Sequence, residues 1–424
     1  MGSLAARLSD VRGTVHNLAH PDNTVNFSLS SGPLPTRSVM ATSTEPGFCV
    51  FCHTVHSSSP ALPPLWNKDF SVETYLPYSS SSLDALSDMS ITQLGQPDDN
   101  SKLCLSCHDG TLAVGTVSVF NGVPSLIELI GTRADGSMPG SASSPEDSGI
   151  TGYTRRLGVD LRNDHPISVN YTMSLARRDG ELRDVDSNQR SYDSDVTIGP
   201  RSGGGNHKLP LFGAVGVAQV QCPTCHDPHI RDDNPLVGNQ KFLRLNRFQE
   251  AQPTGLFSAA NDIVCLGCHE KGGESWAYSA HANDQVAEQT YYSGPGGLRE
   301  FPDDLPVWKA SCLNCHDTHT VEGARYLLRE GTDGTASPVG KIGGNPASEE
   351  TCFQCHSGAT SIVTSAPYSV PDIKSDYGLA IHMPLTTGDQ PASPPEEVHD
   401  IGGNANVVGT AGPGARRPRG AGRR

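Results

Sequence analysis

All twelve cysteines of this chain fall in six short runs of one form, Cys-x-x-Cys-His. In chain order these motifs one to six are CVFCH from Cys49, CLSCH from Cys104, CPTCH from Cys222, CLGCH from Cys265, CLNCH from Cys312 and CFQCH from Cys352. Residues three apart lie on one side of a helical turn, so both thiols can form thioether bonds to the vinyl groups of one porphyrin. The histidine that follows is placed to bind its iron. The spacing is the attachment pattern of c-type haem and predicts six covalently attached haem c groups.

This prediction gives every motif residue a role. The thiols that attach the cofactor are Cys49, Cys52, Cys104, Cys107, Cys222, Cys225, Cys265, Cys268, Cys312, Cys315, Cys352 and Cys355. The proximal iron ligands are His53, His108, His226, His269, His316 and His356. A zinc knuckle does not require a histidine directly after every second cysteine, and a disulfide framework does not require six identical spacings. Both alternatives therefore explain less of the pattern.

Three further histidines recur at one offset, three residues after a proximal histidine. They are His56, His229 and His319, in motifs one, three and five. The repeating unit is thus CxxCHxxH, a spacer and a plain CxxCH, three times over. Three residues make about one helical turn, roughly 5 Å of rise, so this imidazole lies on the same side of its haem as the proximal histidine. We therefore expect it to bind the iron of a different haem and to fasten two haems side by side.

Four other histidines are candidates for the remaining sixth positions. His165, His281 and His382 each follow a plain CxxCH motif, and His16 precedes motif one. With the three above they make seven candidates for six irons, so at least one serves no iron of its own chain. His20, His207 and His399 are expected on the surface or in linkers.

The composition predicts a loop-rich chain that is short of apolar core. Hydrophobic residues make up 35% and aromatic residues 6%, beside 45 glycines and 32 prolines. Six porphyrins would supply the missing apolar surface. The expected fold is mostly irregular coil with short α-helices at the motifs and a little β-structure, a multihaem cytochrome fold organised around a chain of six haems.

The motifs divide the chain into three haem-pair modules and a tail. The modules are residues 1–200, which include a long loop insertion, 201–275 and 276–384, and the tail is residues 385–424, rich in Pro, Gly and Arg and expected to be disordered. Within the first module, Leu112–Phe120 alternates enough to predict a strand or hairpin arm. Residues 132–164 and 174–206 are predicted as loop.

Charge and hydropathy exclude several partners. A net charge of −15 argues against nucleic acid, which requires a basic face. The sequence contains no run of 18 apolar residues and therefore predicts no transmembrane helix. Residues 1–10 contain no apolar stretch of signal-peptide length. Because c-type haem is attached outside the bacterial cytoplasm, a periplasmic or extracellular location is expected.

The segments CPTCHDPH…FLR…CLGCH and CLNCHDTH…LLR…CFQCH resemble the doubled-CxxCH family of multihaem c-type cytochromes. The leading segment from Asp10 with CVFCHTVH, and CLSCHDGT with the downstream His165-Pro166, are similar to the same family, so the resemblance covers about residues 10–385. Such proteins carry electrons in the periplasm or outside the cell, and OmcS-type hexahaem members polymerise into filaments in which a histidine of one subunit binds a haem of the next.

The resemblance implies three kinds of partner: other redox proteins, extracellular electron acceptors, or a second copy in a head-to-tail homopolymer. By the filament analogy, His16 would be a cross-subunit ligand. The chain departs from the family after Pro384, where there is no further CxxCH and an arginine-rich tail follows.

The predicted function is electron transfer along closely spaced bis-histidine haems, without enzymatic activity. Histidine at both axial positions favours low to moderate potentials, because the methionine ligand that raises the potential is missing. The alternative is a multihaem oxidoreductase with one open haem that reduces a nitrogen or sulfur oxyanion. All six motifs end in His and spare histidines exceed need, which disfavours an open iron.

Overall fold

The structure is a computed structural model of the chain. His56 and His382, like His20, His207, His399 and the tail 385–424, lie outside the residues it describes. The described residues are 7–9, 11, 14–19, 39–42, 47–55, 65–80, 83–120, 123–140, 155–186, 196–198, 209–214, 216–232, 241–270, 274–319, 327–329, 349–365 and 370–374.

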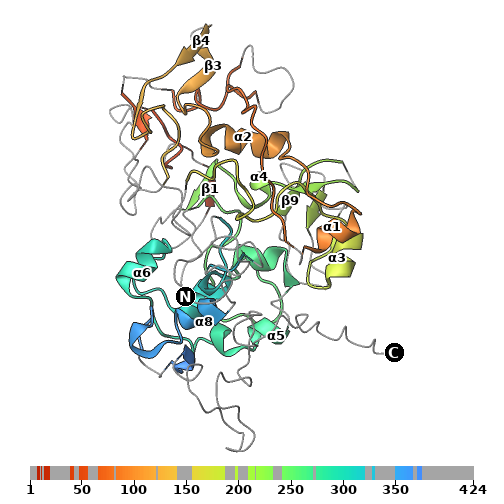
Figure 1. Cartoon of the computed structure of the whole chain (residues 1–424), viewed down its shortest axis with the longest axis vertical. Helices are drawn as coiled ribbons and strands as arrows, with labels where there is room; N and C mark the ends of the chain where they lie inside the picture. Colours follow the sequence, from red (N-terminus) through yellow and green to blue (C-terminus); the bar gives the residue numbers. More distant parts are fainter. Residues whose placement is uncertain are drawn as a thin grey trace, which may run out of the picture.

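Several elements lie along the long axis of the molecule in sequence order, whereas β1 (Arg7–Ser9) and α1 (Asp84–Asp88) lie near its middle (Figure 1). The hairpin of β3 (Thr116–Phe120) and β4 (Val123–Leu126) lies at one end, above α2 (Asp99–His108). The short helix α4 (Cys222–Cys225) is central, and α8 (Glu349–Phe353) lies in the opposite half. Since α2, α4 and α8 carry motifs two, three and six, these motifs are spread along the same axis.

Motif two forms the last turns of the ten-residue helix α2, and the other motifs are built on shorter turns. The 3₁₀-helices η3 (Val264–Gly267) and η6 (Ser311–Asn314) carry motifs four and five. Motif one has no helix, contrary to the expectation of one at every motif. It forms a turn closed by the His53 N–H, which donates to the Cys49 carbonyl over 2.8 Å. The same bond, from the proximal histidine to the first cysteine, closes motifs three to six.

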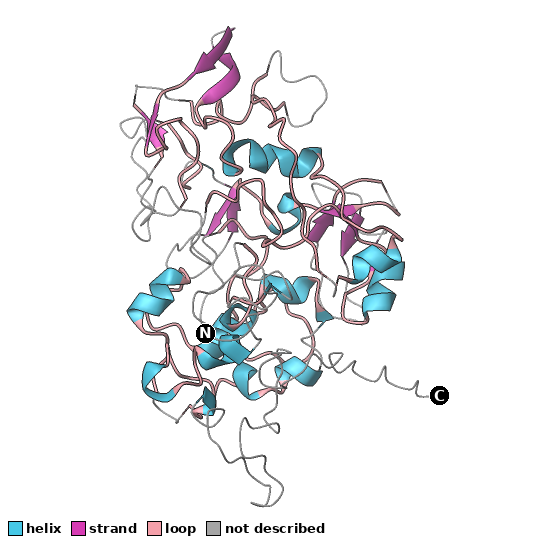
Figure 2. Ribbon diagram, in the orientation of Figure 1, coloured by secondary structure: helices cyan, strands magenta, loops and turns pink. Residues whose placement is uncertain are grey.

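Strands are short and pair antiparallel in small sheets. The sheets are β1 (Arg7–Ser9) with β11 (Ile230–Asp232), β2 (Met40–Ala41) with β5 (Leu129–Ile130), β6 (Val169–Asn170) with β10 (Gln219–Val220), the β3–β4 hairpin, and β7 (Val185–Asp186) with β8 (Val196–Ile198) and β9 (Leu209–Leu211). The strand predicted over 112–120 thus begins at Thr116. In Figure 2 most of the strands lie in the half of the molecule that contains α2.

The loop predicted over 174–206 is wrong in part, because it contains most of helix α3 (Met173–Asp179) and strands β7 and β8. The Thr172 hydroxyl accepts the Leu175 N–H at the start of α3, and Gly180, at φ 80°, ends it. The remaining helices are α1 (Asp84–Asp88), α5 (Glu274–Ala277), η5 (Ala280–Ala282), α6 (Ser293–Leu298), α7 (Val307–Ala310) and η8 (Gly358–Thr360). No described helix is long and apolar enough to cross a membrane.

The apolar core is divided into separate clusters that lie beside the motifs. The largest contains Ile198, Leu209 and Ile263, and the cysteines of motif four pack against it. A second, around Phe51 and Val117, packs against cysteines of motifs one and two. The apolar side chains therefore gather where the thiols are.

Candidate haem sites

Five proximal histidines each face one candidate distal histidine. The ring-centre separations are 6.1 Å for His53–His229, 6.2 Å for His108–His16, 6.3 Å for His226–His319, 6.3 Å for His269–His165 and 6.1 Å for His356–His281. A metal–imidazole bond is about 2.0 Å and the ring centre lies about 1.1 Å beyond the nitrogen, so imidazoles on opposite faces of one metal have centres about 6.2 Å apart. All five separations agree with this value.

Two candidate distal histidines remain for the proximal histidine of motif five. Its proximal histidine is His316. His56 and His382, the two candidates left of the seven, both lie outside the described residues. The ligand assigned to the iron of motif five therefore stays a prediction.

The two described HxxH histidines lie beside the preceding unit. His229 follows His226 by three residues, but its ring faces His53 of motif one. His319 follows His316 by three residues, and its ring faces His226 of motif three. Each ring faces another motif, as the HxxH offset predicts, but the backbone between each proximal histidine and its HxxH histidine is not a turn of helix. Helix α4 ends at Cys225, and His226 is extended, at φ −110° and ψ 144°.

The angle between the paired ring planes differs between odd and even motifs. It is 16° for His53–His229 and 28° for His226–His319. The pairs of motifs two, four and six are nearly perpendicular, at 70° for His16–His108, 77° for His165–His269 and 89° for His281–His356. The distal histidines thus form two classes: HxxH histidines in near-parallel pairs, and loop histidines in near-perpendicular pairs.

Several of these rings are oriented through Nδ1. It contacts a backbone carbonyl in four rings: His108–Arg155 O at 2.6 Å, His226–Lys241 O at 2.6 Å, His165–Pro166 O at 3.1 Å and His356–Pro371 O at 3.0 Å. In His229 and His319 the partner is a carboxylate, Asp227 or Asp164, at 3.0 Å. An Nδ1–H bonded in this way fixes the tautomer and leaves Nε2 as the metal-binding nitrogen.

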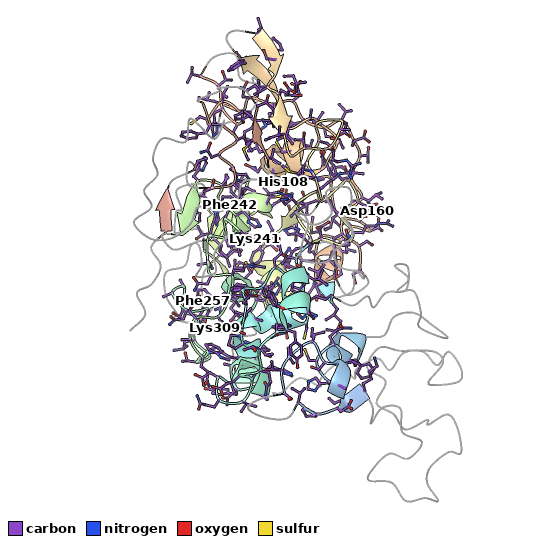
Figure 3. The ribbon with its side chains drawn as sticks, turned by 90° about the vertical axis from the view of Figure 1, so that its left-hand side faces the viewer. His108, Asp160, Lys241, Phe242, Phe257 and Lys309 are labelled. Atoms are coloured by element: carbon purple, nitrogen blue, oxygen red, sulfur yellow. The ribbon has the colours of Figure 1, made fainter. Side chains whose placement is uncertain are left out.

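His16 is held between His108 and the ring of Phe242, against which it stacks at 4.3 Å between ring centres. Figure 3 shows Phe242 below His108 in the same part of the molecule. Burial, followed by the charge of His108, lowers the pKa of His16 to about 3. Burial also lowers the pKa of His165 and of His226 to about 4. These rings are therefore neutral near pH 7, the form in which imidazole binds a metal. The motif spacing did not predict that Phe242 stacks against a candidate iron ligand.

Thiols of consecutive motifs lie against one another. All twelve cysteines are described, and none of them is joined in a disulfide. A hydrogen bond with Cys222 of motif three, followed by burial, raises the pKa of Cys104 of motif two. A bond with Cys312 of motif five, followed by burial, raises the pKa of Cys265 of motif four. The attachment edges of motifs two and three, and of four and five, therefore meet.

A short arm pairs with the proximal histidine in four of the motifs. The antiparallel bridges are His53–Trp66, His226–Leu243, Leu182–His269 and His316–Leu328. In motifs one, three and five, the residue before the bridging one has a positive φ, in Leu65, Phe242 and Leu327. Three large side chains in this strained region mark one local structure used three times.

The side chain after each bridge donates to the carbonyl of the residue that follows the first cysteine. The bonds are Asn67 Nδ2 to Val50 O at 2.7 Å, Arg244 Nε to Pro223 O at 2.8 Å, Arg183 Nε to Leu266 O at 2.7 Å and Arg329 Nε to Leu313 O at 2.8 Å. Arg244 and Arg329 end the FLR and LLR segments that carry the family resemblance, which assigned them no role. Asn67 and Arg183 lie outside both segments, and Arg183 precedes its motif by more than 80 residues.

No protein-family model and no curated protein matches this chain. Among the described residues, no group of three or more His, Cys, Asp or Glu gathers as a protein-only metal site requires. The pairs instead supply two imidazoles each, the number needed by an iron whose other four ligands come from porphyrin. With the thiols of each motif on one turn, the residues fit haem c.

Proposed function

We propose that the chain is a hexahaem c-type cytochrome that carries electrons along a row of bis-histidine haems outside the bacterial cytoplasm. The observation that carries this proposal is the set of five proximal–distal imidazole pairs at 6.1–6.3 Å. When bound, haem c supplies a one-electron couple at its iron. Two thiols of each motif would hold the porphyrin edge, and in five motifs the two paired imidazoles would hold its iron.

The contacts between motifs support a path in sequence order. Thiol pairs join motifs two with three and four with five. Burial and then the charge of the Cys107 thiol of motif two raise the pKa of Cys52 of motif one to about 12. Burial and then the charge of the Cys225 thiol of motif three likewise raise the pKa of Cys268 of motif four. Neighbouring motifs along the chain are therefore neighbours in space from one to five.

The paired imidazoles favour electron transfer over an oxyanion-reducing enzyme. Such an enzyme requires an iron with an open or weakly held sixth position. In five motifs a second imidazole stands where that position would be. We therefore infer six low-spin centres with redox proteins or extracellular acceptors as partners.

The order of the HxxH histidines supports a head-to-tail polymer of this cytochrome. His229 of the second unit faces the first unit, and His319 of the third faces the second. If the same order continued by one unit, an HxxH histidine would face His316 of motif five. His56 is the HxxH histidine that remains, and another copy of the chain would supply it as the ligand. The resemblance implied His16 as the cross-subunit ligand, but His16 lies against His108 of its own chain.

Haem counting and spin state test the central proposal. A pyridine haemochrome assay on the purified protein, with intact mass, is expected to give six covalent haems per chain. Electron paramagnetic resonance (EPR) of the oxidised protein is expected to show low-spin ferric iron. Far fewer than six haems would refute the cytochrome assignment, and a substantial high-spin signal from assembled protein would favour the enzyme.

A further inference from the structure

Two candidate iron ligands differ from the others in what holds their Nδ1 atoms. His319 and His229 contact carboxylates, whereas the other described Nδ1 contacts are to backbone carbonyls. A carboxylate on Nδ1 draws the imidazole proton toward itself and makes Nε2 a stronger donor to a metal. A stronger donor stabilises ferric over ferrous iron, which lowers the reduction potential.

The two carboxylates differ in burial. The Asp164 side chain is 5% exposed, and the Asp227 side chain is 20% exposed. Asp227 also accepts from the Arg244 guanidinium at 3.4 Å, which offsets its charge. Charge acts more strongly where water is excluded, so Asp164 should influence its imidazole more than Asp227 does.

The position of Asp164 is fixed by backbone pairing between distant segments. Asp164 and His319 are 155 residues apart in the sequence. The N–H of His165 donates to the Thr318 carbonyl over 2.8 Å, which holds the residue after Asp164 against the residue before His319. The carboxylate is thus held in place from both segments and does not depend on a flexible loop.

We propose that Asp164 is a positioning residue that makes the iron between His226 and His319 the lowest-potential centre among the five whose imidazole pairs are described. This inference rests on the proposed function. It gives the third position along the row a specific property: an electron passing along the chain occupies this centre least.

The ring planes allow this centre to be recognised by EPR. Near-parallel axial imidazoles split the iron d orbitals strongly and give a rhombic low-spin spectrum, whereas near-perpendicular rings leave two orbitals almost degenerate and give a spectrum with one very large g value. Of the described pairs, only His226–His319 and His53–His229 are near-parallel. The lowest-potential component should therefore belong to the rhombic signal.

The experiment is an EPR-monitored redox titration of the holoprotein with Asp164→Asn, which keeps an acceptor oxygen but removes the charge. The lowest-potential rhombic component is expected to shift upward by about 59 mV or more, a tenfold change for a one-electron couple. Asp227→Asn, the matched variant at the other carboxylate, is expected to give a smaller shift. Asp160→Asn removes an exposed charge paired with Arg162 at 2.5 Å on the same segment, and should leave the component in place (Figure 3 labels Asp160).

Three results would overturn the inference while six haems are retained: no shift in Asp164→Asn, an equal shift in Asp160→Asn, or a lowest-potential component of the perpendicular type. If Asp164→Asn does not assemble six haems, Asp164→Glu decides. A low component retained in Asp164→Glu supports the inference, and one raised to the level of the other centres refutes it. Failure of the proposed function is distinct, because wild-type protein would then hold far fewer than six haems.

Discussion

At the scale of single residues, the assignment of distal ligands depends on which ring each histidine faces. His229 belongs by sequence to motif three, but its ring lies 6.1 Å from that of His53 of motif one. Sequence adjacency and spatial pairing thus predict different targets for one side chain, and a substitution can distinguish them.

His229→Ala is expected to open the iron of motif one and leave that of motif three six-coordinate, because the lost imidazole faces His53. The variant should show one high-spin ferric centre, and after reduction one iron that binds carbon monoxide, with six haems still attached. Adding Cys49→Ala and Cys52→Ala, which removes the motif-one haem, should abolish the high-spin signal. The matched removal of the motif-three haem through Cys222→Ala and Cys225→Ala should leave it. The opposite outcome would show that His229 serves its own motif.

How far the sequence determines these sites depends on the range of each interaction. The thiols and proximal histidines are predictable because covalent attachment fixes their spacing within five residues. The HxxH offset identified His229 and His319, but the backbone that carries them is not helical, so their partners did not follow from one turn of helix. The contact of Asp164 with His319 is not predictable, because Asp164 adjoins His165 in sequence while its hydrogen bond joins segments 155 residues apart.

At the scale of elements, the arms that cover the motifs provide a repeated local structure. Arg244 and Arg329 each bond the carbonyl after the first cysteine and the aspartate after the proximal histidine. The two arms differ in the environment of that aspartate. The Arg329–Asp317 pair spans 2.6 Å with side chains 4% and 9% exposed, whereas Arg244–Asp227 spans 3.4 Å with 17% and 20% exposed.

Arg329→Ala is expected to destabilise the holoprotein by about 3–5 kcal/mol, because the Asp317 carboxylate stays buried without its guanidinium. Arg244→Ala should cost about 1–2 kcal/mol, since Asp227 is more accessible to water and the Arg244 ion pair is longer. Both variants lose an equivalent bond to a carbonyl, so the difference reports the carboxylate together with the contact of the Arg329 guanidinium with the Phe301 ring at 5.6 Å. Chemical denaturation followed by haem absorbance measures it as a shift of the midpoint. Equal shifts would mean that the arms act through their carbonyl bonds alone.

Helix α3 shows where the sequence pattern was insufficient to predict secondary structure. Helix α3 lies in a stretch rich in Ser, Asp and Arg that predicts loop, yet Leu175 and Ala176 are buried. Tertiary packing of two residues and a threonine cap outweighed the composition. The strand over 116–120 was predictable because its alternation matches the period of a half-buried strand.

At the scale of the whole molecule, α2, α4 and α8, which carry motifs two, three and six, follow one another along the long axis (Figure 1). Thiol contacts join motifs one to five in sequence order. A row built in this way has two ends. At one end stands motif one, whose HxxH histidine, His56, lies outside the described residues. Toward the other end stands His316, the proximal histidine for which the HxxH register requires one more unit.

His56→Ala and His382→Ala distinguish the two ways in which the iron of motif five is completed. If another copy supplies the ligand, His56→Ala should abolish polymers seen by electron microscopy and leave one high-spin haem per chain, because an imidazole would be missing at every junction between subunits. His382→Ala should then leave the polymer and the spin state unchanged. If the ligand comes from the same chain, only His382→Ala should create the high-spin centre, and the wild-type protein should remain monomeric in solution. The spin state locates the missing imidazole, and the particle length shows whether that imidazole had joined two subunits.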